Sequence, residues 1–134
     1  MAKQIDELNF PEHLRYSSDH EWAGMEDGLV VVGLNDYAQD QLGDVVFVEL
    51  PEAGASFSAN DVFATVESVK AVSECYIPVT GEVVEVNRSL EDSPETVNSD
   101  PYGAGWFVKI KPESQAEMDA LMTAEEYVAS LKGE

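Results

Sequence analysis

The chain has 134 residues, of which 44% are hydrophobic, and it carries a formal net charge of −20. This length and composition predict one folded domain over residues 1–134 with a modest hydrophobic core. So strong a negative charge repels phosphate backbones, which argues against nucleic-acid binding. The longest apolar stretch, Leu29–Leu34, is too short to cross a bilayer, so we expect no membrane segment.

The N-terminal residues and the cysteine content indicate the compartment. The first ten residues include Asp6 and Glu7, and they lack the apolar core of a signal peptide and the Arg-rich character of a transit peptide. Cys75 is the only cysteine, so no internal disulfide can form, which agrees with a reducing compartment. A lone cysteine in a strand pattern is typical of a small buried residue. We therefore expect a soluble cytoplasmic protein.

Most of the chain has the pattern of short strands separated by turn signals, which is typical of a sandwich or barrel. Strands are expected over residues 19–23, 29–32, 44–50, 61–67, 72–77, 82–86 and 106–110. Residues 24–28, which contain two glycines, are expected to form the loop of the first hairpin. Further along, Val62, Ala64 and Val66 are expected to share one face of their strand.

Short helices are expected between the strands. Asn35 can cap a helix that runs through Gln41 and ends at Gly43. Ser93 is a suitable N-cap and Pro94 a suitable first residue for another helix.

The C-terminal segment is expected to be helical, after a turn at residues 100–103. Residues 114–117 and 123–126 each fit the capping box, in which the first and fourth residues bond each other's backbone N–H groups through their side chains.

Motifs of known catalytic chemistry are missing from the chain. It has no glycine-rich phosphate loop, no HExxH and no paired CxxC. His13 and His20 have no cysteine near them to complete a metal site, and among 27 acidic residues chance carboxylate pairs are expected. The residues therefore predict no catalytic group and no metal site.

Lysine is scarce, and one lysine has an unusual position. Lys3 and Lys132 lie near the ends of the chain, and Lys109 and Lys111 lie on the polar side of a strand. Only Lys70 lies in a tight connection between two strand-like runs. From its position between the two strand-like runs alone, Lys70 is expected to be a solubilising loop residue. A tight hairpin is also what a modifying enzyme needs, because it presents one amine to which a cofactor can be attached.

The residues around Lys70 carry a family resemblance. The run Glu67-Ser68-Val69-Lys70-Ala71 resembles the lipoylation motif of glycine cleavage system H-proteins. Biotin carriers instead have Met-Lys-Met at this point, and the lipoyl domains of 2-oxoacid dehydrogenases usually have Asp-Lys-Ala. The resemblance extends over roughly residues 14–131, and its other main stretches are residues 20–22, 33–51, 81–87 and 100–106.

This resemblance implies a mainly β fold, a flattened hybrid barrel-sandwich of the lipoyl/biotinyl-carrier type with short helices and a helical C-terminus. It also implies a carrier that is not itself an enzyme, with lipoic acid bound covalently to Lys70. The carrier takes the aminomethyl group of glycine from a glycine decarboxylase (P-protein) to an aminomethyltransferase (T-protein), and its dithiol to dihydrolipoamide dehydrogenase (L-protein). A lipoate ligase or octanoyltransferase attaches the group within the motif of Glu67, Ser68, Val69 and Ala71.

In the resembled family the loaded arm folds into a cleft that protects it from water. By this resemblance Glu21 and Glu74 fall where acidic cleft residues are expected, and a carboxylate there can pair with a cationic amine. Gln41 falls where some relatives have a histidine against the arm.

Two other functions remain open. A donor that passes its lipoyl or octanoyl group on to other lipoate-dependent enzymes would use the same lysine, and nothing in the sequence separates it from the shuttle. An unmodified scaffold protein would keep the fold without the chemistry, and the intact motif around Lys70 argues against it.

Overall fold

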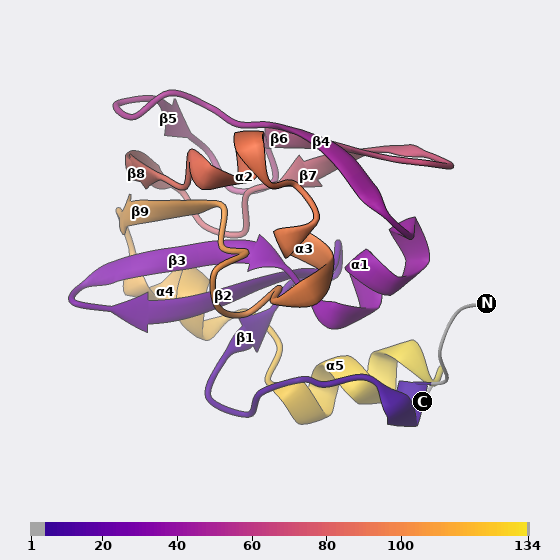
Figure 1. The fold of residues 1–134 in the computed structure, drawn as a ribbon. Helices are drawn as coiled ribbons and strands as arrows, with labels where there is room; N and C mark the ends of the chain where they lie inside the picture. Colours follow the sequence, from indigo (N-terminus) through magenta and orange to yellow (C-terminus); the bar gives the residue numbers. More distant parts are fainter. Residues whose placement is uncertain (1–4, 134) are drawn as a thin grey trace.

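Two antiparallel sheets form the body of the protein, whose computed structural model describes residues 5–133. One sheet has six strands in the order β1-β2-β3-β9-β8-β5, and the other has three in the order β4-β6-β7 (Figure 1). The strands are β1 Arg15–Tyr16, β2 Glu21–Glu26, β3 Leu29–Leu34, β4 Val45–Glu49, β5 Ser56–Phe57, β6 Val62–Ser68, β7 Val72–Tyr76, β8 Gly81–Val86 and β9 Val108–Pro112. The helices are the short 3-10 helix η1 Ile5–Glu7, α1 Asp36–Leu42, α2 Ser89–Asp92, α3 Thr96–Ser99, α4 Gln115–Asp119 and α5 Ala124–Leu131. The predicted mainly β sandwich with short helices and a helical C-terminus is confirmed, and its two sheets do not close into one barrel.

The β2–β3 hairpin is longer than the sequence predicts, because residues 24–26 continue β2. Only Asp27 and Gly28 form the turn, with φ values of 51° and 84°. Two successive positive φ angles define a type I′ turn, whose twist matches that of the paired strands. Gly24 serves packing and not the loop, since a Cβ atom there would lie 2.6 Å from Cδ2 of Leu14.

Helix α1 begins and ends where the sequence predicts. The Asn35 side chain accepts a hydrogen bond from the Ala38 N–H at 2.9 Å, as an N-cap does. At the other end Gly43 has a φ of 76° and donates its N–H to the Gln39 carbonyl at 3.1 Å. Glycine adopts this positive φ without a steric penalty, so the chain leaves α1 sharply and enters β4.

The prediction that Ser93 caps a helix starting at Pro94 is wrong. Ser93 instead ends α2, because its N–H donates to the Ser89 carbonyl at 2.9 Å. Helix α3 begins at Thr96, two residues after Pro94, and no side chain caps it.

The C-terminal helices confirm one capping box and contradict the other. Thr123 and Glu126 bond each other's backbone N–H groups at the start of α5. Ser114 caps α4, but the carboxylate of Glu117 accepts hydrogen bonds from N and Oγ1 of Thr80, both at 2.9 Å. Glu117 therefore joins α4 to the start of β8 and does not close a capping box.

The main hydrophobic core lies between the two sheets. It includes Val30, Val32, Val83, Val108 and Ile110 from the large sheet and Val48, Phe63, Val66 and Cys75 from the small one. Cys75 is 1% exposed, which confirms the expected small buried residue.

One predicted strand face is interrupted by a β-bulge. The pairing of β6 with β7 shifts register between Val62 and Ala64. As a result Val62 is 41% exposed, whereas Phe63 and Ala64 are both buried. An extra residue of this kind breaks the alternation on which the prediction depends.

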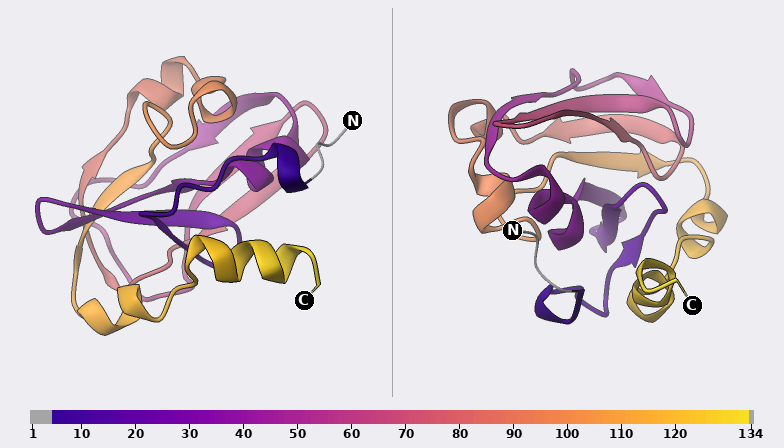
Figure 2. Two further views of the ribbon diagram at one scale, coloured as in Figure 1. Left: turned by 90° about the horizontal axis from the view of Figure 1, so that it is seen from below. Right: turned by 90° about the vertical axis from the view of Figure 1, so that its right-hand side faces the viewer.

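A second apolar cluster covers the outer face of the six-stranded sheet. Its members come from the N-terminal segment, β1 to β3 and α5, and include Leu14, Tyr16, Trp22, Val31, Ala124 and Tyr127. The rings of Tyr16 and Tyr127 stack with centroids 5.1 Å apart. Helix α5, yellow in Figure 2, therefore packs on the same side of the molecule as the N-terminal segment.

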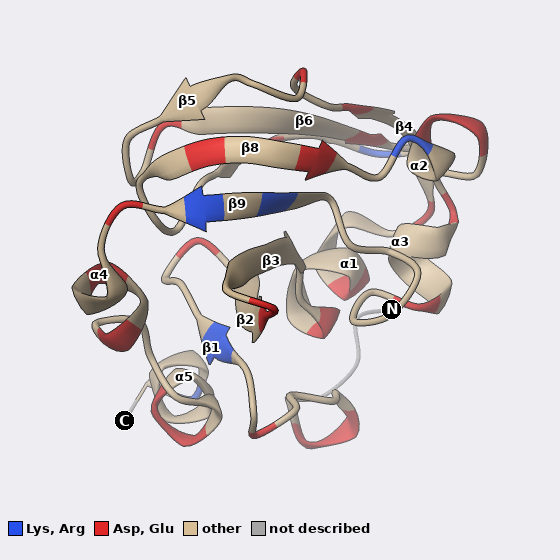
Figure 3. Ribbon diagram, turned by 90° about the vertical axis from the view of Figure 1, so that its left-hand side faces the viewer, with Lys and Arg blue, Asp and Glu red and all other residues tan. Residues whose placement is uncertain are grey.

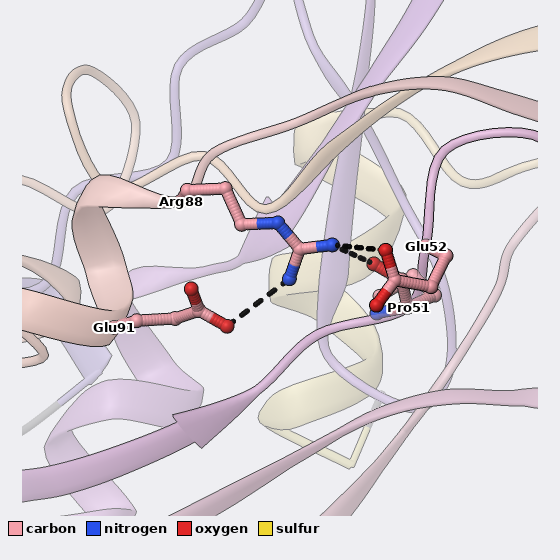
Figure 4. Close-up of polar contacts among 4 residues, drawn as sticks. All are labelled: Pro51, Glu52, Arg88 and Glu91. Carbon is pink, nitrogen blue, oxygen red and sulfur yellow. Dashed lines mark hydrogen bonds and ion pairs between the residues drawn. The ribbon is translucent and has the colours of Figure 1, made fainter.

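Arg88 ties α2 to the loop that follows β4. Its Nη2 donates to the Pro51 carbonyl and to the Glu52 carboxylate, each at 3.0 Å, and its Nη1 donates to Glu91 at 3.0 Å (Figure 4). The ion pairs are solvent-exposed and contribute little, so the bond to the Pro51 carbonyl is the one that fixes the loop.

Negative charge is spread over strands and helices alike (Figure 3). On β9 the Lys109 ammonium pairs with the carboxylates of Glu26 at 2.9 Å and Glu85 at 3.4 Å. Within residues 5–133, none of the helices has the length and apolar character needed to cross a bilayer.

Candidate functional site

Lys70 lies at the tip of the β6–β7 hairpin, which extends beyond the neighbouring strands (Figure 1). The Ser68 N–H donates to the Ala71 carbonyl at 2.8 Å, which closes the turn. The Ser68 hydroxyl oxygen accepts from the N–H groups of Lys70 and Ala71 at 3.3 and 3.1 Å. Both φ angles at Val69 and Lys70 are negative, so ordinary residues fit this turn without strain. The side chain of Lys70 is exposed.

The side chain of Lys70 runs across Gly43, at the end of α1. A Cβ atom at position 43 would lie 3.4 Å from Cε and 4.0 Å from Nζ of Lys70. The hairpin tip is also bonded to the start of β4, since the Val69 N–H donates to the Asp44 carbonyl at 3.0 Å. The absence of a side chain at Gly43 therefore gives Lys70 its path along the surface.

Asn98 in α3 fixes the backbone beneath Lys70. Its Nδ2 donates to the Gly43 carbonyl at 2.9 Å and to Oε1 of Gln39 at 3.0 Å. Its Oδ1 accepts from the Val45 N–H at 2.9 Å. One side chain thus holds the end of α1 and the start of β4 together.

A cleft of about 390 Å³ opens beside the hairpin, between β7, α1 and the start of β2. Its lining consists of Asp19, His20, Glu21, Leu34, Tyr37, Ala38, Gln41, Leu42, Ala71, Val72, Ser73 and Glu74. Its volume lies within the range of about 300–1,000 Å³ that is usual for small-molecule sites. Because the lining includes Ala71 and Val72, the cleft begins next to Lys70.

Glu21 is the buried acid of this cleft, with 1% of its surface exposed. Its Oε1 accepts from the Ser17 hydroxyl at 2.6 Å, and its Oε2 accepts from the Tyr76 N–H at 3.2 Å. Burial raises the pKa of Glu21 to about 8, although these two hydrogen bonds act in the opposite direction and the charge of Asp19 adds to the increase. Burial therefore favours the neutral form of the Glu21 carboxyl.

His20 connects the cleft to the C-terminal helix. Its Nδ1 lies 2.6 Å from the hydroxyl of Tyr127 in α5, and its ring packs against Tyr37 with centroids 4.8 Å apart. Burial lowers the pKa of His20, and the charge of Asp19 partly opposes this. The backbone φ of His20 is 74°, an uncommon value for a residue other than glycine, which marks a tightly determined turn before Glu21.

The structure brings some of the sequence-predicted residues together and separates others. Glu21 and Glu74 line one cleft, with Gln41 beside them, and Glu74 is exposed where Glu21 is buried. Ser68, Val69 and Ala71 belong to the turn that presents Lys70. Glu67 is absent from the cleft lining, because it lies on the central strand β6, between Phe47 on β4 and Val72 on the edge strand β7.

Sequence reasoning identified Gly43 only as a helix end and did not assign His20 or Tyr37 to the site. The helical spacing of Tyr37, Ala38, Gln41 and Leu42 is the signal that could have placed one side of α1 in the cleft.

The residues present fit a long acyl chain on Lys70. The amine is exposed on a tight turn, so an enzyme can reach it. The cleft that begins beside it has apolar walls from Leu34, Ala38 and Leu42, and its two carboxyl groups can meet a polar end group. An amide bond at Nζ would remove the charge of the lysine and leave a mostly apolar arm suited to this lining.

A two-sheet β-sandwich that presents one lysine on a hairpin defines a carrier protein of the lipoyl/biotinyl type. The model of the family described as Glycine cleavage H-protein matches residues 14–134, so the chain belongs to this family.

Curated relatives and a solved structure agree with this membership. A glycine cleavage system H protein of Neisseria gonorrhoeae is 52% identical over 132 residues, which cover 98% of this chain and 99% of the relative. One of Bacteroides fragilis is 50% identical over 122 residues, 91% of this chain and 97% of the relative. The crystal structure of a glycine cleavage system H protein from Mycobacterium marinum superposes with a TM-score of 0.84 at 41% identity, covering 93% of this chain and all of that one.

Proposed function

We propose that this protein is the lipoyl carrier of the glycine cleavage system and that Lys70 is its attachment point. The observation that carries the assignment is the position of Lys70, exposed on a turn closed by Ser68 and adjoining a cleft of about 390 Å³. The hydrogen bonds from the N–H groups of Lys70 and Ala71 to the Ser68 hydroxyl hold the turn in one conformation. A modifying enzyme can therefore bind the backbone around the amine in a defined geometry.

The attached group supplies a dithiolane that two electrons can open and close. The role requires three enzyme partners: a glycine decarboxylase (P-protein), an aminomethyltransferase (T-protein) and dihydrolipoamide dehydrogenase (L-protein). A lipoate ligase or octanoyltransferase is required to load Lys70. The catalytic groups then belong to the partners, and this chain transports the aminomethyl group between them. We assign the protein to the cytoplasm, in keeping with its single buried cysteine.

The cleft gives the chain its own part in transport. Leu34, Ala38 and Leu42 would exclude water from an apolar arm bound in the cleft. Glu74 lies exposed in the lining and attracts a cationic amine. A cationic amine held in the cleft beside the buried Glu21 would favour ionisation of its carboxyl and would so lower its pKa.

Intact-mass spectrometry after loading tests the assignment. Incubation with lipoate–protein ligase, lipoate and ATP should add one lipoyl group to the wild-type protein and none to Lys70→Arg. The exposed Lys111→Arg is the matched control and should load normally. Loaded wild-type protein should also support glycine-dependent exchange of carbon dioxide by the decarboxylase. Loading of Lys70→Arg, or exchange that does not depend on Lys70, would contradict the proposal.

A further inference from the structure

Exposed apolar side chains gather around the turn that carries Lys70. Among the described residues, seven large hydrophobic side chains are conspicuously exposed, and four of them lie here: Val46 (55%), Phe47 (47%), Val69 (69%) and Val72 (66%). We call these four residues the outer apolar patch.

The register of the small sheet explains why these side chains face outward. Phe47 is paired with Glu67 and Glu67 with Val72, so the three lie in one row across β4, β6 and β7. Side chains in one row point to the same face of a sheet, and those of the next row point to the other. The next row contains Val48 and Val66, which are 1% and 0% exposed in the core.

The bulge in β4 and the hairpin turn complete the patch. The register of β4 against β6 shifts between Val45 and Phe47, which leaves Val46 as the extra, exposed residue. Val69 is held beside the start of β4 by its hydrogen bond to the Asp44 carbonyl. The patch is therefore a continuous feature of the sheet end next to Lys70.

Negative charge surrounds the patch. Glu67 lies in its central row, and the exposed Asp44 and Glu49 lie at the start and end of the adjoining strand β4. In the described strands β4, β6 and β7 and the turn between the last two, Lys70 is the only Lys or Arg. A partner that covers this surface therefore needs apolar side chains at its centre and Lys or Arg around them.

We propose that the outer apolar patch is the docking surface for the enzyme that acylates Lys70, and this inference rests on the proposed function. The unmodified lysine extends only one side chain from the turn, so the acyl donor must approach to within that length. Val69 is adjacent to Lys70 and Val72 is two residues away, so such an enzyme has to contact both. An enzyme that acts on the far end of the completed arm is under no such constraint and can dock elsewhere.

The test compares initial rates of acylation of unmodified protein by lipoate–protein ligase, followed by intact mass over a range of protein concentrations. The variant is the double substitution Val46→Thr and Val69→Thr, at two patch residues outside the cleft lining, which keeps the side-chain shape and a β-branched residue in each position. The matched control is Val62→Thr with Val84→Thr, at two sites of 41% and 40% exposure outside the patch. Circular dichroism during heating checks that both variants fold.

The patch variant should raise KM for the carrier about tenfold with kcat changed less than twofold, and the control should stay within twofold of wild type in both. Wild-type KM should also rise between about 0.05 and 0.3 M salt, because screening weakens attraction to basic residues. Equal KM values for patch variant, control and wild type would overturn the docking surface while leaving Lys70 as the attachment point. Failure of the wild-type protein to load would overturn the proposed function itself.

A second measurement tests the choice of partner. Variants loaded to completion are assayed with the glycine decarboxylase, and the apparent affinity of the patch variant should equal that of wild type. A loss as large as the one seen with the ligase would overturn the assignment of the patch to the acylating enzyme.

Discussion

The side-chain amide of Asn98 donates a hydrogen bond of 2.9 Å to the carbonyl of Gly43 and so ties α3 to the end of α1. The same side chain accepts from the N–H of Val45, a residue only 3% exposed. The backbone beneath Lys70 is therefore held by a residue that lies far away in the sequence.

Replacing Asn98 with alanine should lower the free energy of unfolding by about 2 kcal/mol, because it leaves the Gly43 carbonyl and the Val45 N–H without their partner. Urea denaturation measures the change. Asn98→Asp, which keeps only the acceptor for Val45, should fall between alanine and wild type. Ser99→Ala, at an exposed neighbouring residue, is the control and should change stability by less than about 0.5 kcal/mol. Equal stability of Asn98→Ala and Ser99→Ala would show that the hydrogen bonds of Asn98 to Gly43 and Val45 do not stabilise the fold.

Gly43→Ala should destabilise the fold and should also displace the Lys70 side chain. The same substitution at Gly54 should destabilise the fold alone, so it separates the two effects. Gly43 and Gly54 have φ values of 76° and 98°, so alanine at either site should cost about 1–2 kcal/mol of unfolding free energy. Only at position 43 does the new methyl group meet Lys70, because nothing lies within 4 Å of a Cβ atom at Gly54. NMR shifts of the Lys70 side chain should therefore move in Gly43→Ala and stay unchanged in Gly54→Ala. Identical spectra for Lys70 in both variants would refute the close approach.

Local sequence signals predict the structure well where a residue forms its hydrogen bonds with residues close to it in the sequence. Asn35 and Gly43 bound α1 as expected, because a cap bonds backbone groups within the same turn of helix. The prediction for Ser93 was wrong because the same side-chain type can follow one helix as readily as precede another. The capping box at residue 114 was wrong because Glu117 is recruited by Thr80, 37 residues earlier.

The candidate site shows the same division. The residues around Lys70 could be read from the sequence because they form one uninterrupted run. The cleft could not, since Glu21, Tyr37 and Glu74 come from different elements and meet only in the folded chain. Family resemblance supplied Glu21 and Glu74, whereas the outward row of Phe47 and Val72 depends on a sheet register that alternation alone does not specify.

Glu21→Gln should change how stability depends on pH. The pKa of Glu21 is 4.5 in the unfolded chain and about 8 in the folded protein. Between these two pH values the folded protein keeps a proton on Glu21 that the unfolded chain has lost. The contribution of Glu21 to the free energy of unfolding is therefore complete below pH 4.5, falls as pH rises from 4.5 to 8, and is lost above pH 8. The full loss is on the order of 5 kcal/mol. Glutamine cannot titrate, so the variant should be the more stable of the two above pH 8.

The measurement is the difference in unfolding free energy between Glu21→Gln and wild type from pH 5 to 9, since the other acidic residues cancel in it. This difference should increase as the pH rises to about 8 and should stay constant at higher pH. A difference that stays constant over this range would mean that the buried carboxyl is already ionised. Gln41→Ala, at an exposed residue of the same cleft, adds and removes no titrating group, so it serves as the control and should leave the pH profile unchanged.

Glu67→Lys should impair loading of Lys70. The half-buried Glu67 lies between Phe47 and Val72, and a positive charge there would repel a basic acceptor surface. We expect KM for the acylating enzyme to increase about tenfold, which corresponds to about 1.4 kcal/mol. Glu82→Lys on β8 makes the same charge change in the other sheet and should load at the wild-type rate. Normal loading of Glu67→Lys would be the contrary result.

The bond between Glu21 and the Tyr76 N–H also has a consequence for solubility. Strand β7 forms an edge of the small sheet, and unpaired N–H groups along such an edge can recruit a strand from another molecule. Because alternate residues of a strand direct their N–H groups to the same side, the backbone N–H groups of Val72 and Glu74 point to the same side as that of Tyr76, away from β6. Glu21 binds the N–H group at one end of this row, and α1 forms the opposite wall of the cleft along the rest. We therefore expect the cleft proposed for the tethered arm also to hinder pairing of this sheet edge with a strand of another molecule.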